Sequence, residues 1–280
     1  MKSFFKFVSP AASSSILVIG GAQWSSSQWK AGELDLSSPE VINLEGKTCS
    51  LLPEKYPKNV YDAVGAFIND QVVICGGSVY YGFEKIKECY TLKKGGTTWT
   101  LLGNLNSVDS CSSSVVVNNK LYVIGGYSDT DGTCTTIESI SLDGTTTVEN
   151  ITVNGNLHPF EWDTSIRYCL KKGASVTINS TTSISIGGMG DSEVWGDSGS
   201  WEYDERTLYY NGETFSEGPN LITGRFSGHA AGLLRDKDTN EEYIAVVGGR
   251  DKNFEIVDSL DSVELLKVGD NKWKSGIYLF

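Results

Sequence analysis

The chain has 280 residues, enough to bury a substantial core either as one large domain or as two ordinary ones. Its 35 acidic residues outnumber its 23 basic ones, and the formal net charge of −12 argues against nucleic acid or an anionic membrane as a partner. No apolar stretch approaches the ~20 residues of a membrane-spanning helix, so we expect no membrane insertion.

The N-terminal stretch MKSFFKFVSPAASS has some features of a secretion signal, but Lys6 interrupts its apolar part and the first repeat strand follows at once. We therefore do not expect a signal peptide within this sequence. Whether a signal peptide or a further blade precedes it stays open.

A hydrophobic run that ends in two glycines occurs five times along the chain: ILVIGG (16–21), VVICGG (72–77), LYVIGG (121–126), SISIGG (183–188) and IAVVGG (244–249). The copies follow one another at intervals of about 50 to 60 residues, a period typical of propellers rather than helical solenoids. The repetition favours a single domain over residues 1–280.

Each repeat reads as four short strands. An apolar or alternating segment and an Asn-rich turn precede the Gly-Gly strand, as in GAFINDQVVICGG (65–77), which predicts a β-hairpin. A variable loop and a strand with an acidic residue follow, at Glu88, Glu138, Glu202 and Glu264; in the first repeat either Glu33 or Glu40 fits. The last strand often carries an aromatic residue, such as Trp99, Phe215 or Trp273. Four short strands are typical of a propeller blade.

These residues resemble the kelch family: a Gly-Gly pair, an acidic residue in the next strand, a Trp after Gly77 and Gly249, and the Arg and His of GRFSGHAAGLL (224–234). The resemblance implies an all-β kelch-type β-propeller of five four-stranded antiparallel blades. A six-bladed ring that lacks an N-terminal blade remains the alternative. The first and third repeats depart most from the pattern, so we expect the least regular outer strands there.

The glycine pairs are expected to be structural, because neighbouring backbones converge at the end of an inner strand and glycine permits close approach and unusual dihedrals. The set is Gly20, Gly21, Gly76, Gly77, Gly125, Gly126, Gly187, Gly188, Gly248 and Gly249. A nucleotide-binding loop needs a helix after the glycines, and none is indicated after GGMGDSE (187–193).

Nothing in the sequence indicates a catalytic residue, a metal site or a cofactor. Some kelch proteins are enzymes, but a copper or iron site needs several histidines, and this chain has only His158 and His229. We interpret His229 as the structural histidine of the family's first strand, and the acidic third-strand residues as partners of a hydrogen bond between blades.

The loops after the glycine pairs and the links between blades should emerge on one face of the ring. Residues there suited to recognition are Trp24, Trp29, Tyr80, Tyr81, Phe83, Tyr127, Trp195, Phe254, Trp162 and Arg225. The sequence therefore predicts a non-catalytic, monomeric module that binds a protein or an extracellular glycan. The alternatives are a carbohydrate-active enzyme on a kelch propeller and an intracellular kelch adaptor protein.

Six cysteines and two glycosylation acceptor triplets, at Asn150 and Asn179, favour a secreted glycoprotein over a cytoplasmic protein. Cys75 ends one strand and Cys89 lies early in the next, so adjacent antiparallel strands would set them side by side in a disulfide. Two buried thiols in a cytosolic protein are the competing interpretation. The sequence does not predict the pairing of Cys49, Cys111, Cys134 and Cys169.

Overall fold

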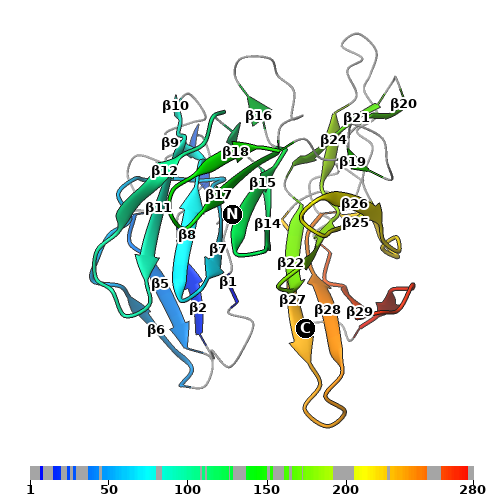
Figure 1. Cartoon of the computed structure of the whole chain (residues 1–280). Coiled ribbons are helices and arrows are strands. Elements are labelled where there is room, and N and C mark those ends of the chain that lie inside the picture. Colours follow the sequence, from blue (N-terminus) through cyan, green and yellow to red (C-terminus); the bar gives the residue numbers. More distant parts are fainter. Residues whose placement is uncertain are drawn as a thin grey trace.

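The computed structural model describes residues 7–8, 15–19, 24–25, 28–29, 37–43, 46–79, 84–107, 109–110, 112–125, 127–128, 137–149, 152–153, 161–163, 166–171, 173–191, 205–225, 228–250 and 260–276. Every regular element within these ranges is a β-strand (Figure 1). The all-β prediction is therefore confirmed.

Five large sheets form the blades of a five-bladed β-propeller, as the repeats predict. Blade 1 contains β1 (Phe7–Val8), β2 (Ser15–Val18), β5 (Glu40–Asn43) and β6 (Thr48–Leu51). Blade 2 contains β7 (Val64–Ile68), β8 (Gln71–Cys75), β11 (Glu88–Lys93) and β12 (Thr100–Asn104). Blade 3 contains β14 (Ser113–Val117), β15 (Lys120–Ile124), β17 (Ile137–Ser141) and β18 (Thr146–Val148).

Blade 4 contains β22 (Ala174–Asn179), β23 (Thr182–Ile186), β25 (Thr207–Tyr210) and β26 (Thr214–Glu217), and blade 5 contains β27 (Ala230–Arg235), β28 (Glu242–Val247), β29 (Val263–Lys267) and β30 (Lys274–Ser275). The four strands of each blade are antiparallel neighbours in chain order. Blade 4 also carries β19 (Thr152–Val153), which pairs parallel with β26 at its outer edge. The described outer strands are shortest in blade 5 (β30) and blade 3 (β18), and the expected irregularity of the first and third repeats stays a prediction.

The turns within the first hairpins follow from their asparagines. Asn69 and Asp70 between β7 and β8, and Asn118 and Asn119 between β14 and β15, all have positive φ. Two consecutive positive φ values are those of a type I′ turn, whose twist matches that of the flanking strands. Asn and Asp tolerate this conformation better than other residues with a side chain.

The hydrophobic core lies between successive blades. Alternate residues of each inner strand point to opposite faces, so one sheet packs against both of its neighbours. Four buried clusters result, at the junctions of blades 1 and 2, 2 and 3, 3 and 4, and 4 and 5. Large side chains fill them, such as Tyr56 and Trp99 in the first, Phe215 in the third and Trp273 in the last.

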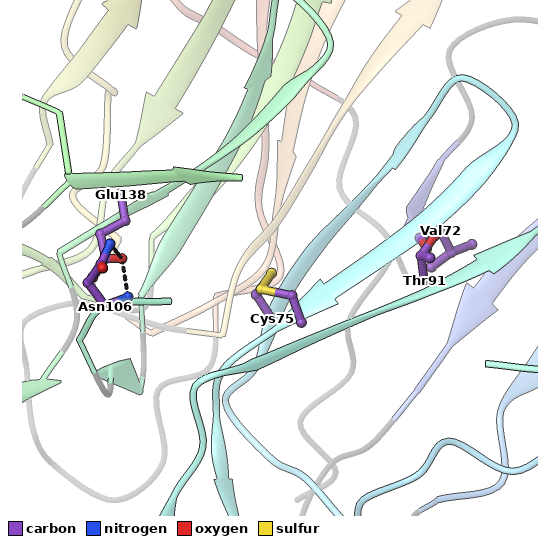
Figure 2. Close-up of a disulfide and its surroundings, with 6 residues drawn as sticks. Val72, Cys75, Thr91, Asn106 and Glu138 are labelled. Atoms are coloured by element: carbon purple, nitrogen blue, oxygen red, sulfur yellow. Dashed lines mark hydrogen bonds between the residues drawn. A yellow bond between two sulfur atoms is a disulfide. The ribbon is translucent and has the colours of Figure 1, made fainter. Parts of the chain in front are cut away.

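The expected disulfide is present in blade 2. Cys75 of β8 and Cys89 of β11 are directly opposite in the antiparallel register, and both are buried (Figure 2). The bond closes a loop with a sequence separation of 14, for which chain entropy predicts about 3 kcal/mol of stabilisation. Cys49 is free and exposed. Cys111 and Cys134 lie outside the described residues, and only the backbone of Cys169 is described, in β21 (Ile166–Lys171).

The glycines after the second strands take the strained conformation that the sequence implies. Gly76, Gly77, Gly125, Gly187, Gly188, Gly248 and Gly249 all have positive φ, whereas Gly20, Gly21 and Gly126 lie outside the described residues. At Gly77 the backbone also passes very close to the link from blade 1. A Cβ there would lie 2.8 Å from both the nitrogen of Ala63 and the carbonyl oxygen of Tyr61.

We predict that Gly77→Ala destabilises the protein much more than Gly95→Ala, although both glycines have positive φ. At Gly95 nothing lies within 4 Å of an added Cβ, so only the left-handed backbone costs energy, about 1–2 kcal/mol. At Gly77 the added methyl group must also displace backbone, which places the cost above about 3 kcal/mol. Urea denaturation of the two variants measures the difference; equal costs would show that the close approach does not constrain the blade.

Candidate interaction face

Short strand pairs lie outside the four-stranded blades. They are β3 (Trp24–Ser25) with β4 (Gln28–Trp29), β9 (Ser78–Val79) with β10 (Glu84–Lys85), β13 (Asp109–Ser110) with β16 (Tyr127–Ser128), and β21 with β20 (Glu161–Asp163) and β24 (Met189–Asp191). Figure 1 shows β9, β10, β16, β20, β21 and β24 together at the top, opposite the β27–β28 turn. The segments after the glycine pairs of blades 2, 3 and 4 thus share one side, which we call the loop face.

Four of the predicted recognition residues have described backbone positions in these strand pairs. Trp24 and Trp29 pair across β3 and β4, Tyr127 pairs with Ser110, and Trp162 lies in β20. Tyr80, Tyr81, Phe83, Trp195 and Phe254 lie outside the described residues. Their role in binding therefore stays a prediction.

Arg225 does not belong to the loop face, contrary to the sequence-based expectation. Its side chain is 0% exposed, and Nη2 donates to Oε1 of Glu264 at 2.9 Å and to Oγ of Ser262 at 3.0 Å. Its Nη1 donates to the carbonyl oxygen of Gly248, the first glycine of the blade 5 pair. A buried guanidinium needs such partners, so Arg225 stabilises the junction of blades 4 and 5 from inside.

The buried carboxylate of Glu138 anchors the link that enters blade 3. Its oxygens accept hydrogen bonds from the backbone nitrogen of Asn106 at 2.6 Å (Figure 2) and from that of Ser107 at 2.7 Å. The side chains of the same two residues donate as well. Glu138 is 1% exposed, and charge-assisted bonds of this kind are what allow a carboxylate to be buried. The hydrogen bonds of Glu138 thus run to the link between blades 2 and 3, and not to a neighbouring blade as the sequence-based interpretation had it.

Glu264 repeats this arrangement one junction later in the ring. Its carboxylate accepts from the backbone nitrogens of Ile222 at 2.6 Å and Thr223 at 3.2 Å, in the link that enters blade 5. Arg225 provides the compensating charge. In both links a buried leucine, Leu105 or Leu221, comes directly before the two donating residues.

In blade 2 the acidic residue of the third strand, Glu88, forms an ion pair with its link in place of these backbone hydrogen bonds. Its link has the buried Tyr56 where the others have leucine, but Pro57 follows and lacks the N–H group that a carboxylate would bind. The Nζ atom of Lys58 lies 3.1 Å from Oε1 of Glu88 instead. Partial burial raises the pKa of the Glu88 carboxyl, but backbone hydrogen bonds and Lys58 outweigh it and hold that pKa below its ordinary value. Glu202 of blade 4 lies outside the described residues.

His229 joins blades 4 and 5 near the ion pair of Arg225 and Glu264, as its interpretation as a structural histidine implies. Nε2 lies 2.9 Å from the carbonyl oxygen of Ile186 and 3.1 Å from the nitrogen of Ala174, both in blade 4. Burial lowers the pKa of His229 to about 4, and the nearby charge of Arg225 acts in the same direction, against the hydrogen bond to Ile186. Nδ1 is buried without a hydrogen-bond partner.

Sequence reasoning missed the residues that the carboxylates hold: Lys58, Asn106, Ser107, Ile222 and Thr223. Their contribution is mostly a backbone N–H group, which every residue except proline has, so residue type carries almost no signal. Only the preceding large apolar residue recurs between repeats.

The remaining site predictions concern metals, glycans and membranes. No group of three or more potential metal ligands is found among the residues that the structure describes. Asn179 is exposed at the end of β22, and its Oδ1 accepts from the nitrogen and the Oγ1 of Thr181; Asn150 lies outside the described residues. Within the same ranges, no helix has the length and apolar character to cross a membrane.

Comparison with known proteins adds two similarities. The Kelch motif matches residues 110–144, which include the first three strands of blade 3 and end in the turn before its outer strand β18. The Kelch repeat and BTB domain-containing protein 2 of Ectromelia virus (strain Moscow) is 25% identical over 127 residues, which are 45% of this chain and 21% of that protein. The chain thus matches about a fifth of its relative's length.

We predict that His229 makes the protein less stable as the pH falls from about 6.5 to about 4. The unfolded chain takes up a proton near the ordinary pKa of 6.5, whereas the folded protein does so only near 4. The difference corresponds to about 3 kcal/mol, present above the higher pKa and lost on acidification.

Chemical denaturation of the wild type and of His229→Gln at pH 7 and pH 4.5 tests this. Carboxylates titrate in both proteins, so the comparison isolates the histidine. The wild type should lose about 2–3 kcal/mol more than the variant on acidification. Equal losses would mean that His229 takes up a proton in the folded protein as readily as in the unfolded one.

Proposed function

We propose, from the premise that the chain belongs to the kelch-repeat β-propeller family, that it is a non-catalytic module that binds another protein through its loop face. The observation that carries the proposal is that the strand pairs after the glycine pairs of blades 2, 3 and 4 lie on one side of the propeller. The links that enter blades 3 and 5 are fixed by the buried carboxylates of Glu138 and Glu264. Loops on a rigid scaffold are suited to recognition because they can vary without changing the core.

The use of the described charged residues supports binding rather than catalysis. Glu138, Glu264 and Arg225 are buried and use their polar groups inside the protein. His229 is likewise buried between two blades. The residues that most resemble catalytic groups in the sequence are therefore structural.

The chemistry of the loop face favours a protein partner. Tryptophan and tyrosine dominate binding hot spots because they bury a large area and keep a polar group for hydrogen bonding. The same aromatic residues could stack on sugars, so an extracellular glycan is the second ligand class that we include in the proposal. The buried disulfide and the exposed Asn179 triplet support an extracellular location.

An intracellular adaptor is the alternative that the relative favours. The name of that viral protein combines kelch repeats with a BTB domain, but the match covers only 21% of its length. The adaptor role therefore has less support than the binding role, which depends on the propeller alone.

We predict that Trp24, Tyr80, Tyr81, Tyr127 and Trp195, changed together to Ala, weaken partner binding by more than about 2 kcal/mol, or about 30-fold. Because loop positions on a rigid scaffold tolerate substitution, the melting temperature should stay within about 2 °C. The matched control is Lys237→Ala with Asp238→Ala, in the exposed β27–β28 turn on the opposite side (Figure 1).

The wild type, the five-fold variant and the control each serve as bait in a cross-linked capture experiment. Each protein that the wild type and the control retain is then purified, and its binding to the three baits is measured by calorimetric titration. A glycan array with the same three proteins tests the second ligand class. Partners that bind the five-fold variant as tightly as the wild type would contradict the proposal and move the search to another surface.

A further inference from the structure

The acceptor triplet Asn179-Ser180-Thr181 spans the end of β22 and the turn that follows it, and all three residues are exposed. Oligosaccharides are attached to asparagine in the pattern Asn-X-Ser/Thr, where X is not proline, and such sites lie on the protein surface. Asn150 of the other triplet lies outside the described residues. Exposure alone is common in turns, but the conformation and contacts of this triplet distinguish it from the corresponding turns of blades 2 and 3.

The backbone of this turn does not require an asparagine. In the first hairpins of blades 2 and 3, Asn69, Asn118 and Asn119 have positive φ, a conformation that asparagine tolerates better than most residues. The hairpin of blade 4 has a different turn, because its register shifts between Thr177 and Asn179, and the φ of Asn179 is not positive. The left-handed conformation that explains the asparagines of the other two turns therefore does not explain Asn179.

The side chain of Asn179 uses its oxygen and leaves its nitrogen available. Oδ1 accepts from the backbone nitrogen of Thr181 at 2.9 Å and from its Oγ1 at 3.0 Å. Within the described part of the chain, both hydrogen bonds of this side chain go to Oδ1, so Nδ2 has no protein partner there. An N-linked glycan is attached at Nδ2. Both hydrogen bonds can therefore persist in the glycosylated protein.

The triplet is also fixed to the neighbouring blade through its backbone. The carbonyl oxygen of Ser180 accepts from the backbone nitrogen of Asn118 at 2.7 Å, in the β14–β15 turn of blade 3. Asn179 itself pairs with Thr182 across the hairpin. A glycan on Asn179 would therefore start from a rigid position beside blades 3 and 4.

The triplet lies at the end of blade 4 opposite the loop face. In β22, Ala174 pairs with Ile186, which directly precedes the glycine pair, whereas Asn179 pairs with Thr182 at the other end of the same hairpin. The strand β24, which follows the glycine pair, lies with β20 and β21 at the top of Figure 1, above β22. A glycan on Asn179 would therefore leave the loop face accessible to a partner.

A glycan at this position is compatible with the folded core. Oligosaccharide is transferred as the chain enters the secretory pathway, and a bulky polar group on a side chain that must be buried would oppose folding. In this hairpin the packing against blade 5 is made by Val176 and Ile184, which are buried, whereas Asn179 is exposed. Attachment at Asn179 thus displaces no buried contact.

We propose that Asn179 is an N-glycosylation site whose glycan covers the side of blades 3 and 4 opposite the loop face. The proposal rests on the extracellular location included in the proposed function, and it leaves the loop face as the side open to partners. The donor is an oligosaccharide linked to a lipid pyrophosphate. The bond between its anomeric carbon and the pyrophosphate oxygen breaks, that carbon bonds to Nδ2, Nδ2 gives up one proton, and the lipid pyrophosphate leaves with the bonding electrons.

The test uses the full chain behind a cleavable secretion signal, expressed in eukaryotic cells and purified from the medium. Peptide mass spectrometry before and after treatment with peptide N-glycosidase, which releases the glycan and converts its asparagine to aspartate, measures the occupancy of each acceptor. We expect a glycan on Asn179 in most molecules. Asn179→Gln and Thr181→Ala should abolish it, whereas Thr181→Ser should keep it because the hydroxyl group remains.

Asn211 provides a matched control in the same blade. It is exposed in the turn between β25 and β26, and its Oδ1 accepts from the backbone nitrogens of Glu213 and Thr214, much as that of Asn179 accepts from Thr181. The third residue of its triplet is Glu213, so Asn211 should carry no glycan. Glu213→Thr creates an acceptor triplet there and should add one, which shows that the transferase reaches exposed turns of this blade.

An unmodified Asn179 in the secreted chain, beside a glycosylated Asn211 in the Glu213→Thr variant, would overturn the proposal. Because the glycan displaces no buried contact, the melting temperatures of the glycosylated and enzymatically deglycosylated protein should agree within about 2 °C. A larger difference would contradict a glycan that projects from the surface. Occupancy is measured without a partner, so failure here is distinct from failure of the proposed function, which would appear as unchanged binding by the five-fold variant.

Discussion

The propeller depends on buried carboxylates that must be satisfied by the chain segment entering their own blade. Glu138 and Glu264 are almost fully buried, and an unpaired charge in such a place would cost several kcal/mol. Each is satisfied by consecutive backbone N–H groups rather than by one cation alone. Because these donors belong to the preceding link, burial of the carboxylate fixes the path of the chain from one blade to the next.

This constraint explains how one side of the ring can vary in sequence without loss of the fold. The carboxylates bind the backbone N–H groups of the links. The strand pairs after the glycines leave the blades at residues whose backbone conformation only glycine adopts easily, such as Gly77. Loops on a rigid scaffold tolerate changes of sequence. Recognition residues can therefore change there, while Arg225 and His229 keep blades 4 and 5 together.

Much of the fold follows from local sequence. The glycine pairs and alternating strands predict the five sheets, and the register that they imply brings Cys75 opposite Cys89. The added strand β19 could not be predicted, because two residues pairing in parallel at an outer edge leave no periodic pattern. Arg225 was misplaced because its burial depends on Glu264, 39 residues away, and no local pattern reports such a contact. The choice of Glu40 over Glu33, which lies outside the described residues, likewise needed the register of β5 against β2.

Native-state hydrogen exchange of wild type and Glu138→Gln tests the role of the buried carboxylates most directly. The substitution keeps the size of the side chain but removes its charge and one acceptor oxygen, so the amides of Asn106 and Ser107 should lose protection about 10- to 100-fold. The amides of Ile222 and Thr223, held by Glu264, provide the control within the same molecule and should keep theirs. Unchanged protection at Asn106 and Ser107 would contradict the account, because the link would then be held without the carboxylate.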